Sequence, residues 1–277
     1  MPEKPSPENQ GAARREHVND GSYQPRTRLF VEAPLSAGAS VELPAPQAHY
    51  LVNVMRLKAG DAVCLFNGRD GEWRASIAEA KRKTCAVAVD SLLRAQAVDL
   101  DLWLLFAPLK KARTDYLAEK ATELGAALLW PVYTRRTVAE RVNLDRLRAN
   151  AIEAAEQSER LTVPELREPA KLMDALQGWP AERRLILCDE SGTAPPIAEA
   201  LRDQLTPMKP GAKPSGSYAV LIGPEGGFAS DELDALRKLP FVTPVGLGPR
   251  VLRADTAALA ALACLQALVG DWQQSRD

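Results

Sequence analysis

The amino-acid sequence predicts an α/β protein in two parts, a small N-terminal β-barrel and a larger C-terminal α/β domain. After about residue 95, apolar segments of strand length alternate with helical segments, which is typical of a buried parallel sheet. Between about residues 26 and 95 the apolar segments are short and separated by turn residues, which favours a barrel. Of the 277 residues, 46% are hydrophobic and 26% charged, which excludes a collagen-like, coiled-coil or wholly disordered protein.

Residues 1–25 are rich in Pro, Glu, Asn, Gln and Gly, and we expect them to form a disordered tail. They offer too little apolar surface to offset the entropy of ordering. They also lack the apolar segment of a secretory signal. The longest nearly apolar run, residues 257–269, is too short to cross a bilayer core of about 30 Å. We therefore expect a cytoplasmic protein that does not contact a membrane.

The predicted barrel comprises residues 26–95. Its strands are expected at residues 29–31, 62–66, 72–77 and 84–90, and a short helix at residues 47–55. Asn67 and Gly68 predict a tight hairpin turn between the second and third strands, because Asn-Gly readily adopts the positive φ that such turns need. A further turn is expected at residues 58–61.

The predicted α/β domain comprises residues 96–277. Its strands are expected at residues 98–106, 128–132, 184–188, 218–222 and 241–245, and its helices at 113–124, 143–157, 196–205, 231–238 and 256–269. Gly125 follows the first helix at the position where glycine often ends helices. Ser230 precedes the fourth helix and is a suitable N-cap. Residues 206–217 are rich in Pro, Gly and Ser, which indicates a flexible loop.

Charge and cysteine content exclude some classes of function. With 35 Lys and Arg against 36 Asp and Glu, the net charge of −1 excludes binding of nucleic acid through bulk charge alone. Residues 26–95 hold ten basic and seven acidic residues, a net of +3, which favours the barrel as the part that contacts a polyanion. The four cysteines form no CxxC and the chain has two histidines, so no metal site is predicted and a Ser-His-Asp triad is hard to assemble.

Three loops that follow the last three predicted strands are the strongest candidates for a site. They are residues 189–192, 223–228 and 246–253, and two of them are rich in glycine. Ligands of α/β sheets bind at the C-terminal ends of strands, where glycine lets the backbone approach a ligand. Neither glycine-rich loop has the GxGxxG or GxxxxGK[ST] pattern, so no Rossmann dinucleotide site or P-loop is predicted. Pro224 and Pro249 stiffen the loops, which favours a pocket of fixed shape.

The residues of these loops carry a resemblance to a known family. LIGPEGGF (221–228) followed by LGPRVLRADTAAL (247–259) resembles the RsmE family, as do KATELG (120–125) and EQSERLTVPEL (156–166). These are S-adenosylmethionine-dependent methyltransferases of the SPOUT class that methylate N3 of a uridine in the decoding region of 16S rRNA. The resemblance implies a trefoil-knotted α/β domain, a PUA-like N-terminal barrel, a homodimer, and 16S rRNA or the small ribosomal subunit as partner. Two positions depart from the family pattern: Asp255 replaces a glutamate, and Glu159 stands where glycine is frequent.

Carried over residue by residue, the resemblance implies a site on these loops. The residues expected to bind S-adenosylmethionine are Leu187, Gly223, Glu225, Gly226, Leu247, Gly248, Pro249, Val251, Leu252 and Arg253. Arg253 and Arg250 are candidates for stabilising the uridine anion or for holding the target phosphate. Glu225 or Asp255 is a candidate for accepting the N3 proton, and Glu225 could also face the sulfonium. The residues of the barrel expected to follow an RNA backbone are Arg26, Arg28, Arg56, Lys58 and Arg74.

Two other functions are compatible with the residues alone. The chain could be an RNA-binding module with a catalytically silent α/β domain, although such a domain has little reason to present two glycine-rich loops. It could also be a nucleotide hydrolase that holds phosphate in the GPEGG loop, but the loop has no lysine and no acid pair for a metal is evident.

Overall fold

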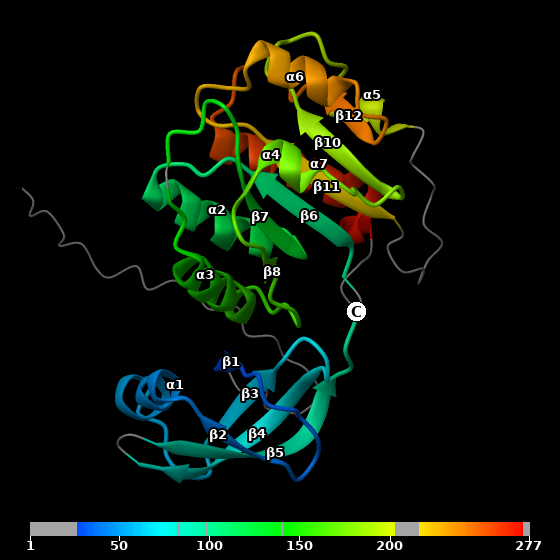
Figure 1. Cartoon of the computed structure of the whole chain (residues 1–277). Helices are drawn as coiled ribbons and strands as arrows, with labels where there is room; N and C mark the ends of the chain where they lie inside the picture. The colour runs from blue at the N-terminus through cyan, green and yellow to red at the C-terminus, as the bar shows by residue number, and fades with distance from the viewer. Residues whose placement is uncertain (1–26, 82–83, 98, 140, 203–215, 274–277) are drawn as a thin grey trace, which may run out of the picture.

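A computed structural model of the chain describes residues 27–81, 84–97, 99–139, 141–202 and 216–273 (Figure 1). The described strands form two sheets, one of five strands near the N-terminus and one of seven strands in the remainder. The predicted tail, Arg26 and most of the predicted loop at 206–217 lie outside the described residues. Among the described residues, no helix is long and apolar enough to cross a membrane.

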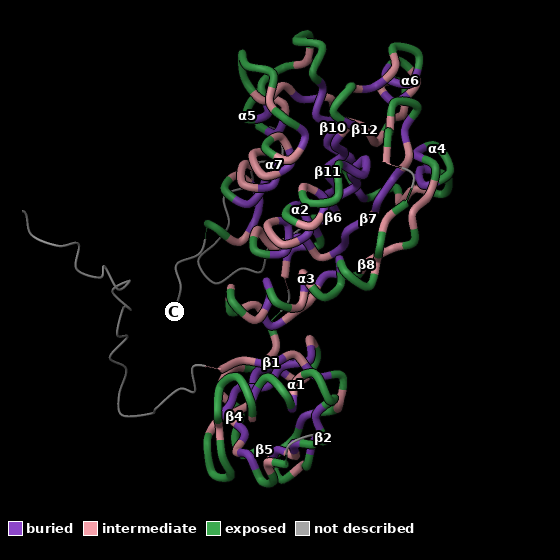
Figure 2. The backbone as a smooth tube through the Cα atoms, turned by 90° about the vertical axis from the view of Figure 1, so that its left-hand side faces the viewer, coloured by how far each residue is buried: buried purple, intermediate pink, exposed green. Residues whose placement is uncertain are grey.

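The N-terminal sheet has the order β1-β3-β4-β5-β2. Its strands are β1 (Arg28–Phe30), β2 (Ser40–Leu43), β3 (Ala62–Phe66), β4 (Glu72–Ala80) and β5 (Cys85–Arg94). Strands β1 and β3 are parallel and the other pairs antiparallel. Helix α1 (Ala45–His49) continues into a π-helical turn (Tyr50–Val54). The strands curve around a common interior that includes Leu51, Val63 and Ile77 (Figure 2).

The sheet of the C-terminal part has the order β12-β10-β11-β6-β7-β8, with β9 paired to β7. Its strands are β6 (Asp101–Phe106), β7 (Leu128–Tyr133), β8 (Glu165–Leu166), β9 (Ala170–Lys171), β10 (Arg183–Cys188), β11 (Ser217–Ile222) and β12 (Val242–Val245). Every pair in it is parallel, so the predicted α/β class is confirmed. The trefoil knot stays a prediction.

Helices cover both faces of this parallel sheet (Figure 1). They are α2 (Lys111–Glu123), α3 (Leu144–Gln157), α4 (Leu172–Ala175), α5 (Ile197–Ala200), α6 (Ser230–Arg237) and α7 (Ala254–Val269). On one face, Leu104 of β6 is buried with residues of α2, α3, α5 and α7. On the other face, Leu105 is buried with residues of α4 and α6. The alternation of Leu104 and Leu105 follows from the period of two along a strand.

Several local predictions need correction. Asn67 and Gly68 belong to a five-residue connection, 67–71, rather than a two-residue turn; the Asn67 side chain accepts hydrogen bonds from the amides of residues 69 and 70. Ser230 is the first residue of α6, and no side chain caps that helix. Helix α5 covers only Ile197–Ala200 of the predicted 196–205. Strand β2 and helix α4 were not predicted.

Pro131 lies inside β7, where its missing N–H would normally weaken a sheet. The ladder explains why it is tolerated. Strand β8 pairs with β7 at Leu128 and Leu129, and β9 pairs with it at Val132 and Tyr133. The proline therefore coincides with the gap between two short neighbouring strands.

Arg28 connects the N-terminal sheet to helix α3. Its guanidinium donates to the carbonyl oxygens of Ala155, Glu156 and Arg160 at 2.8–2.9 Å and pairs with Glu72 at 2.5 Å. Arg94 also pairs with Glu72, at 2.7 Å. Burial alone would raise the pKa of Glu72, but hydrogen bonds from Arg94 and Arg28 outweigh it and hold that pKa below its usual range. We call Arg28, Glu72 and Arg94 the Arg28 cluster.

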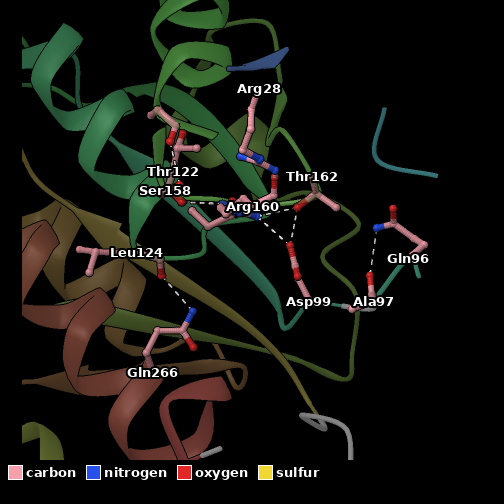
Figure 3. Close-up of polar contacts among 12 residues, drawn as sticks. Arg28, Gln96, Ala97, Asp99, Thr122, Leu124, Ser158, Arg160, Thr162 and Gln266 are labelled. Carbon is pink, nitrogen blue, oxygen red and sulfur yellow. Dashed lines mark hydrogen bonds and ion pairs between the residues drawn. The ribbon is translucent and has the colours of Figure 1, made fainter. Parts of the chain in front are cut away.

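Arg160 fixes the segment after α3 to the parallel sheet (Figure 3). Its Nη1 donates to the carbonyl oxygens of Thr122 and Ala126 at 2.7 and 2.9 Å, and its Nη2 contacts Asp99 and Thr162 at 3.0 and 2.9 Å. The guanidinium therefore ties the end of α2 and the residue after Gly125 to the segment after α3; the Thr122 carbonyl also accepts from the amide of Gly125.

Glu159 lies in the chain between carbonyl groups bound by Arg28 and directly before Arg160. Its backbone is left-handed, with φ 61°. A residue with a Cβ pays about 1–2 kcal/mol there, whereas glycine adopts it freely. We expect Glu159→Gly to raise the free energy of unfolding by up to about 1 kcal/mol, since part of the gain is lost to the freedom of glycine in the unfolded chain. Urea denaturation measures this, and Glu159→Ala, which keeps the strain, is the control. An equal effect of both variants would contradict the explanation.

Candidate functional site

The three loops predicted to form the site lie together at one edge of the parallel sheet. Strands β11 and β12 both pair with β10 in parallel, so the loops that follow all three leave the same edge. The amide of Phe228 donates to Glu190 Oε1 at 2.9 Å, which joins the loop after β11 to the loop after β10. Gly246 donates to the carbonyl oxygen of Pro195 at 2.8 Å, which joins the loop after β12 to the same segment. The prediction that these loops meet is confirmed.

Glycine is required in these loops for two different reasons. Gly227 has φ +66°, and a Cβ built on it would lie 2.2 Å from Glu190 Oε1. Gly246 has a carbonyl oxygen 3.1 Å from its Cβ position, so the two segments touch through backbone. Gly226 and Gly248 differ, because their nearest neighbours are at 3.8 Å or beyond 4 Å. A Cβ on Gly223, Gly227 or Gly246 would therefore be crowded, one on Gly226 would make ordinary contact with Arg136, and one on Gly248 would meet no atom within 4 Å.

Asp189 anchors the loop after β10. Its side chain is fully buried and accepts from Nε and Nη2 of Arg237, on α6, at 3.0 and 2.5 Å. Burial would raise the pKa of Asp189, but hydrogen bonds from Ser191 and Arg237 outweigh it and hold that pKa below its usual value. The carboxylate therefore serves to fix the loop, and its partners leave it little capacity to bind a ligand.

Arg113 is a member of the site that the sequence did not assign to it. From the first turn of α2, its Nη1 contacts Glu225 Oε1 at 2.5 Å and its Nε lies 3.9 Å from Asp255 Oδ2. It thus bridges the loop after β11 and the first turn of α7. A glutamate, which the family resemblance leads us to expect in place of Asp255, would reach farther toward this guanidinium. Arg136 supports the same loop by donating to the carbonyl oxygen of Gly226 at 2.9 Å.

The residues predicted to bind a cofactor differ in their accessibility. The side chain of Leu187 is wholly buried in the core beside Leu221, so only its backbone could contribute to a site. Leu247 packs against the core on the other face of the sheet, the face covered by α2, α3, α5 and α7. The half-buried members are Gly223 and Leu252, and the exposed members are Glu225, Gly226, Gly248, Pro249, Val251 and Arg253.

The two candidate arginines lie on the exposed end of the loop after β12. Arg250 is exposed within the loop, and Arg253 is the N-cap residue of α7 with an extended backbone. Among the described residues, no carboxylate forms an ion pair with either arginine. Both guanidinium groups are thus available for a negatively charged ligand.

The five residues predicted to contact RNA have different surroundings. Arg28 is 9% exposed and its donors are used by the Arg28 cluster and by α3, which leaves little of it for an RNA backbone. Arg56 and Lys58 are exposed after the π-helical turn, and Arg56 has φ 57°. Arg74 is half-buried on β4. Arg26 lies outside the described residues.

Comparison with known proteins gives consistent matches over most of the chain. A family model described as "RNA methyltransferase domain" matches residues 96–266, and one described as "RNA methyltransferase PUA domain" matches residues 43–90. The protein named ribosomal RNA small subunit methyltransferase E in Rickettsia conorii is 31% identical over 243 residues, which are 87% of this chain and 95% of that protein. The protein of the same name in Synechocystis sp. is 30% identical over 256 residues, which are 91% of this chain and 80% of that protein.

A solved structure matches in the same way. The crystal structure of a ribosomal RNA small subunit methyltransferase E from Neisseria gonorrhoeae, bound to S-adenosyl methionine, superposes with a TM-score of 0.75 at 26% identity. The match covers 90% of this chain and 100% of that chain.

Proposed function

Because this chain belongs to the RNA methyltransferase family, we propose that it transfers a methyl group from S-adenosylmethionine to N3 of a uridine in 16S rRNA. The observation that carries the proposal is the meeting of three loops, two of them glycine-rich, at one edge of the parallel sheet. We further propose that residues 26–95 form the RNA-binding domain and residues 96–277 the catalytic domain. We also propose that the protein acts in the cytoplasm, because its proposed substrate is ribosomal RNA.

The residues of the three loops fit the cofactor. S-adenosylmethionine supplies an activated methyl group when bound. No atom lies within 4 Å of the Cβ position of Gly248, and Gly226 is exposed, so backbone groups there can reach a ligand, as a polar adenine edge and a methionine tail require. Leu252 offers an apolar contact, and Glu225 offers negative charge toward a sulfonium. These residues would hold the cofactor together with Gly223 and Leu247.

Methylation at N3 requires removal of a proton and stabilisation of the resulting negative charge more than it requires covalent catalysis. The net reaction replaces the N3 proton of uridine by a methyl group, so the proton leaves and negative charge develops on O2 and O4. We propose that Arg253, supported by Arg250, stabilises this charge, and that Glu225 accepts the proton. Arg113 would orient Glu225 through their 2.5 Å contact. Exact placement of N3 supplies much of the remaining rate.

Gly226→Val tests the cofactor site. A Cβ at residue 226 would be 3.8 Å from Arg136, so the fold tolerates a side chain there. We expect the branched valine to block the space next to the loop and to weaken S-adenosylmethionine binding at least about tenfold, while the melting temperature stays within a few degrees. Isothermal titration and thermal denaturation measure the two quantities. Unchanged affinity would place the cofactor elsewhere.

Charge reversal of Arg56 and Lys58 tests the RNA surface. If each contacts a phosphate, the double variant should weaken 16S rRNA binding and lower the slope of log affinity against log salt by about 1–2. The matched control is Lys81→Glu in the same domain, because Lys81 already pairs with Glu79. An unchanged slope in the double variant would move the RNA surface to another face.

We also propose that the chain forms a homodimer through α7 and the loop before it. Val251 is 87% exposed, and α7 contains a single charged residue, Asp255, over its sixteen positions. An exposed valine beside a helix with so few charges fits a subunit interface. Light scattering should give twice the chain mass, and Val251→Asp should lower it. A wild-type mass of one chain would remove the proposal.

Mass spectrometry of 16S rRNA provides the direct test of the activity. Cells that lack this protein should lose one N3-methyluridine, and the purified protein with S-adenosylmethionine should restore it to RNA or subunits from those cells. Wild-type protein that binds the RNA but not S-adenosylmethionine at millimolar concentration would favour the silent RNA-binding module instead.

A further inference from the structure

One cavity that the structure describes is lined in part by Pro224 and Glu225 of the GPEGG loop, and so borders the loop that the cofactor would contact. We propose that this cavity binds a nucleotide of the RNA substrate, and that Lys110, Lys111 and Arg141 contact its phosphates. The proposal rests on the RNA methyltransferase function and names the place where the acceptor binds.

Two helix starts and one loop form the cavity, which has a volume of about 990 Å³. Its walls are the end of the β6–α2 connection with the first residues of α2, residues 138–139 and 141–147 before and in the first turn of α3, Glu168, and two residues of the GPEGG loop, Pro224 and Glu225. This volume is at the upper end of the range for small-ligand sites and accommodates a nucleotide with its neighbouring phosphates.

The cavity is distinct from the predicted cofactor site. Of the residues expected to hold S-adenosylmethionine, Glu225 alone is among those that line it. Glu225 therefore stands at the boundary between the two spaces. A base bound in the cavity would lie next to the loop that holds the methyl donor, which is the arrangement that a direct transfer needs.

The cations of the lining have no described partner. Lys110, Lys111 and Arg141 are exposed, and no ion pair joins them to any residue that the structure describes. Two carboxylates of the same lining are already neutralised, Asp115 by Arg146 at 2.6 Å and Glu225 by Arg113 at 2.5 Å. The remaining carboxylates of the lining are Asp145 and Glu168. Among the described residues of the lining, the unpaired charge is therefore three cations against two anions.

Lysine at the start of α2 is unfavourable for the helix itself. Lys110 is the N-cap residue and Lys111 the first helical residue, and the first turn holds no acidic side chain to offset the positive end of the helix dipole. The first turn of α3 borders the same cavity. A bound phosphate would offset the positive end of α2, whereas α3 already has Asn143 as its cap and Asp145 in its first turn.

The rest of the lining is apolar and suits a base and a ribose. Leu109, Val138, Val142, Leu144 and Pro224 contribute hydrocarbon to the walls. Val138 is 89% exposed, so its hydrocarbon is accessible to a ligand in the cavity. Mixed apolar walls and nearly balanced charge fit a nucleotide better than a bare phosphate ion.

The test compares charge reversal in the cavity with charge reversal at the opposite edge of the sheet. The test variant is Lys111→Glu/Arg141→Glu. The control is Arg184→Glu/Lys238→Glu, two exposed cations at the start of β10 and the end of α6. Filter binding with 16S rRNA measures RNA affinity, isothermal titration measures S-adenosylmethionine affinity, and methylation assays give the KM for RNA.

We expect the cavity variant to raise the RNA Kd and KM at least about tenfold at physiological salt, with S-adenosylmethionine affinity unchanged and the control within about twofold of wild type. Equal effects of the two double variants, or none, would overturn the proposal. A wild-type protein that binds the RNA through this cavity but transfers no methyl group would overturn the proposed function and not the site.

A second measurement does not depend on the variants folding. Ultraviolet crosslinking of wild-type protein to 16S rRNA carrying 4-thiouridine should label peptides from residues 108–115 or 138–147. Labels confined to the N-terminal sheet would overturn the proposal.

Discussion

Alanine at position 253 is expected to slow methyl transfer by about 10²–10³-fold, the usual cost of removing one donor to a developing oxyanion. Arg253 is exposed at the N-cap of α7, and no side chain caps that helix. The variant should therefore fold normally and, if the role is in the transition state, bind S-adenosylmethionine with nearly wild-type affinity. Single-turnover rates with 16S rRNA and isothermal titration separate the two quantities.

Arg250→Ala is the matched control, because Arg250 is exposed on the same loop three residues earlier. If Arg250 only supports Arg253, the Arg250→Ala variant should slow methyl transfer by about tenfold or less. Arg253→Lys should recover part of the rate, since charge is retained but the fork of donors is lost. Equal losses in cofactor affinity and rate for Arg253→Ala would assign Arg253 to cofactor binding and not to charge stabilisation.

Glu72→Ala is expected to lower the free energy of unfolding by about 3–5 kcal/mol, the range for breaking a buried ion pair on one side. The side chains of Glu72 and Arg28 are 6% and 9% exposed, so the substitution leaves the Arg28 guanidinium buried without its carboxylate. Glu79→Ala provides the control, because the Glu79–Lys81 pair is more than half exposed and such pairs contribute about 0–1 kcal/mol. Urea denaturation measures both variants.

The pH dependence of the same variant gives an independent check. The folded protein holds the pKa of Glu72 below its usual value of 4.5, so the charged form is favoured in the folded state. Its contribution is therefore fully present above about pH 4.5 and lost as the pH falls through the lower folded pKa. Wild-type stability should decrease in this acidic window more steeply than that of Glu72→Ala. Parallel curves would contradict the assignment.

The sequence predicted the five longer strands of the parallel sheet because each is a largely apolar segment between turn residues, but it missed β8 and β9, which have two residues each. Strand β2 (Ser40–Leu43) escaped because it has four residues, of which two are polar and exposed. Helix starts were less certain: Ser230 looked like a cap, but the chain turns into the helix one residue earlier, at Ala229. Such boundaries depend on tertiary packing, which local propensity does not contain.

The candidate loops were found from their glycines and from their place after successive strands. Arg113 was missed as part of the site because its contact with Glu225 joins positions 112 residues apart. Arg28 was expected to contact RNA because its contacts with residues 155–160, far along the chain, could not be read from the sequence either. A basic residue next to a strand has the same local sequence whether it is solvated or turned toward α3, and only the fold distinguishes the two. The roles of the loop residues in catalysis stay predictions.

The contact between Arg28 and the last turn of α3 fixes the separation between the N-terminal sheet and the glycine-rich loops. Because one guanidinium grips three carbonyl oxygens in the segment 155–160, the N-terminal sheet is held against the body that carries the glycine loops. RNA anchored on that sheet would meet the loops at a constant span along its path. A fixed separation of this kind could determine which uridine reaches the loops by its distance along the RNA from the anchoring point. No side chain would then need to contact the neighbouring bases.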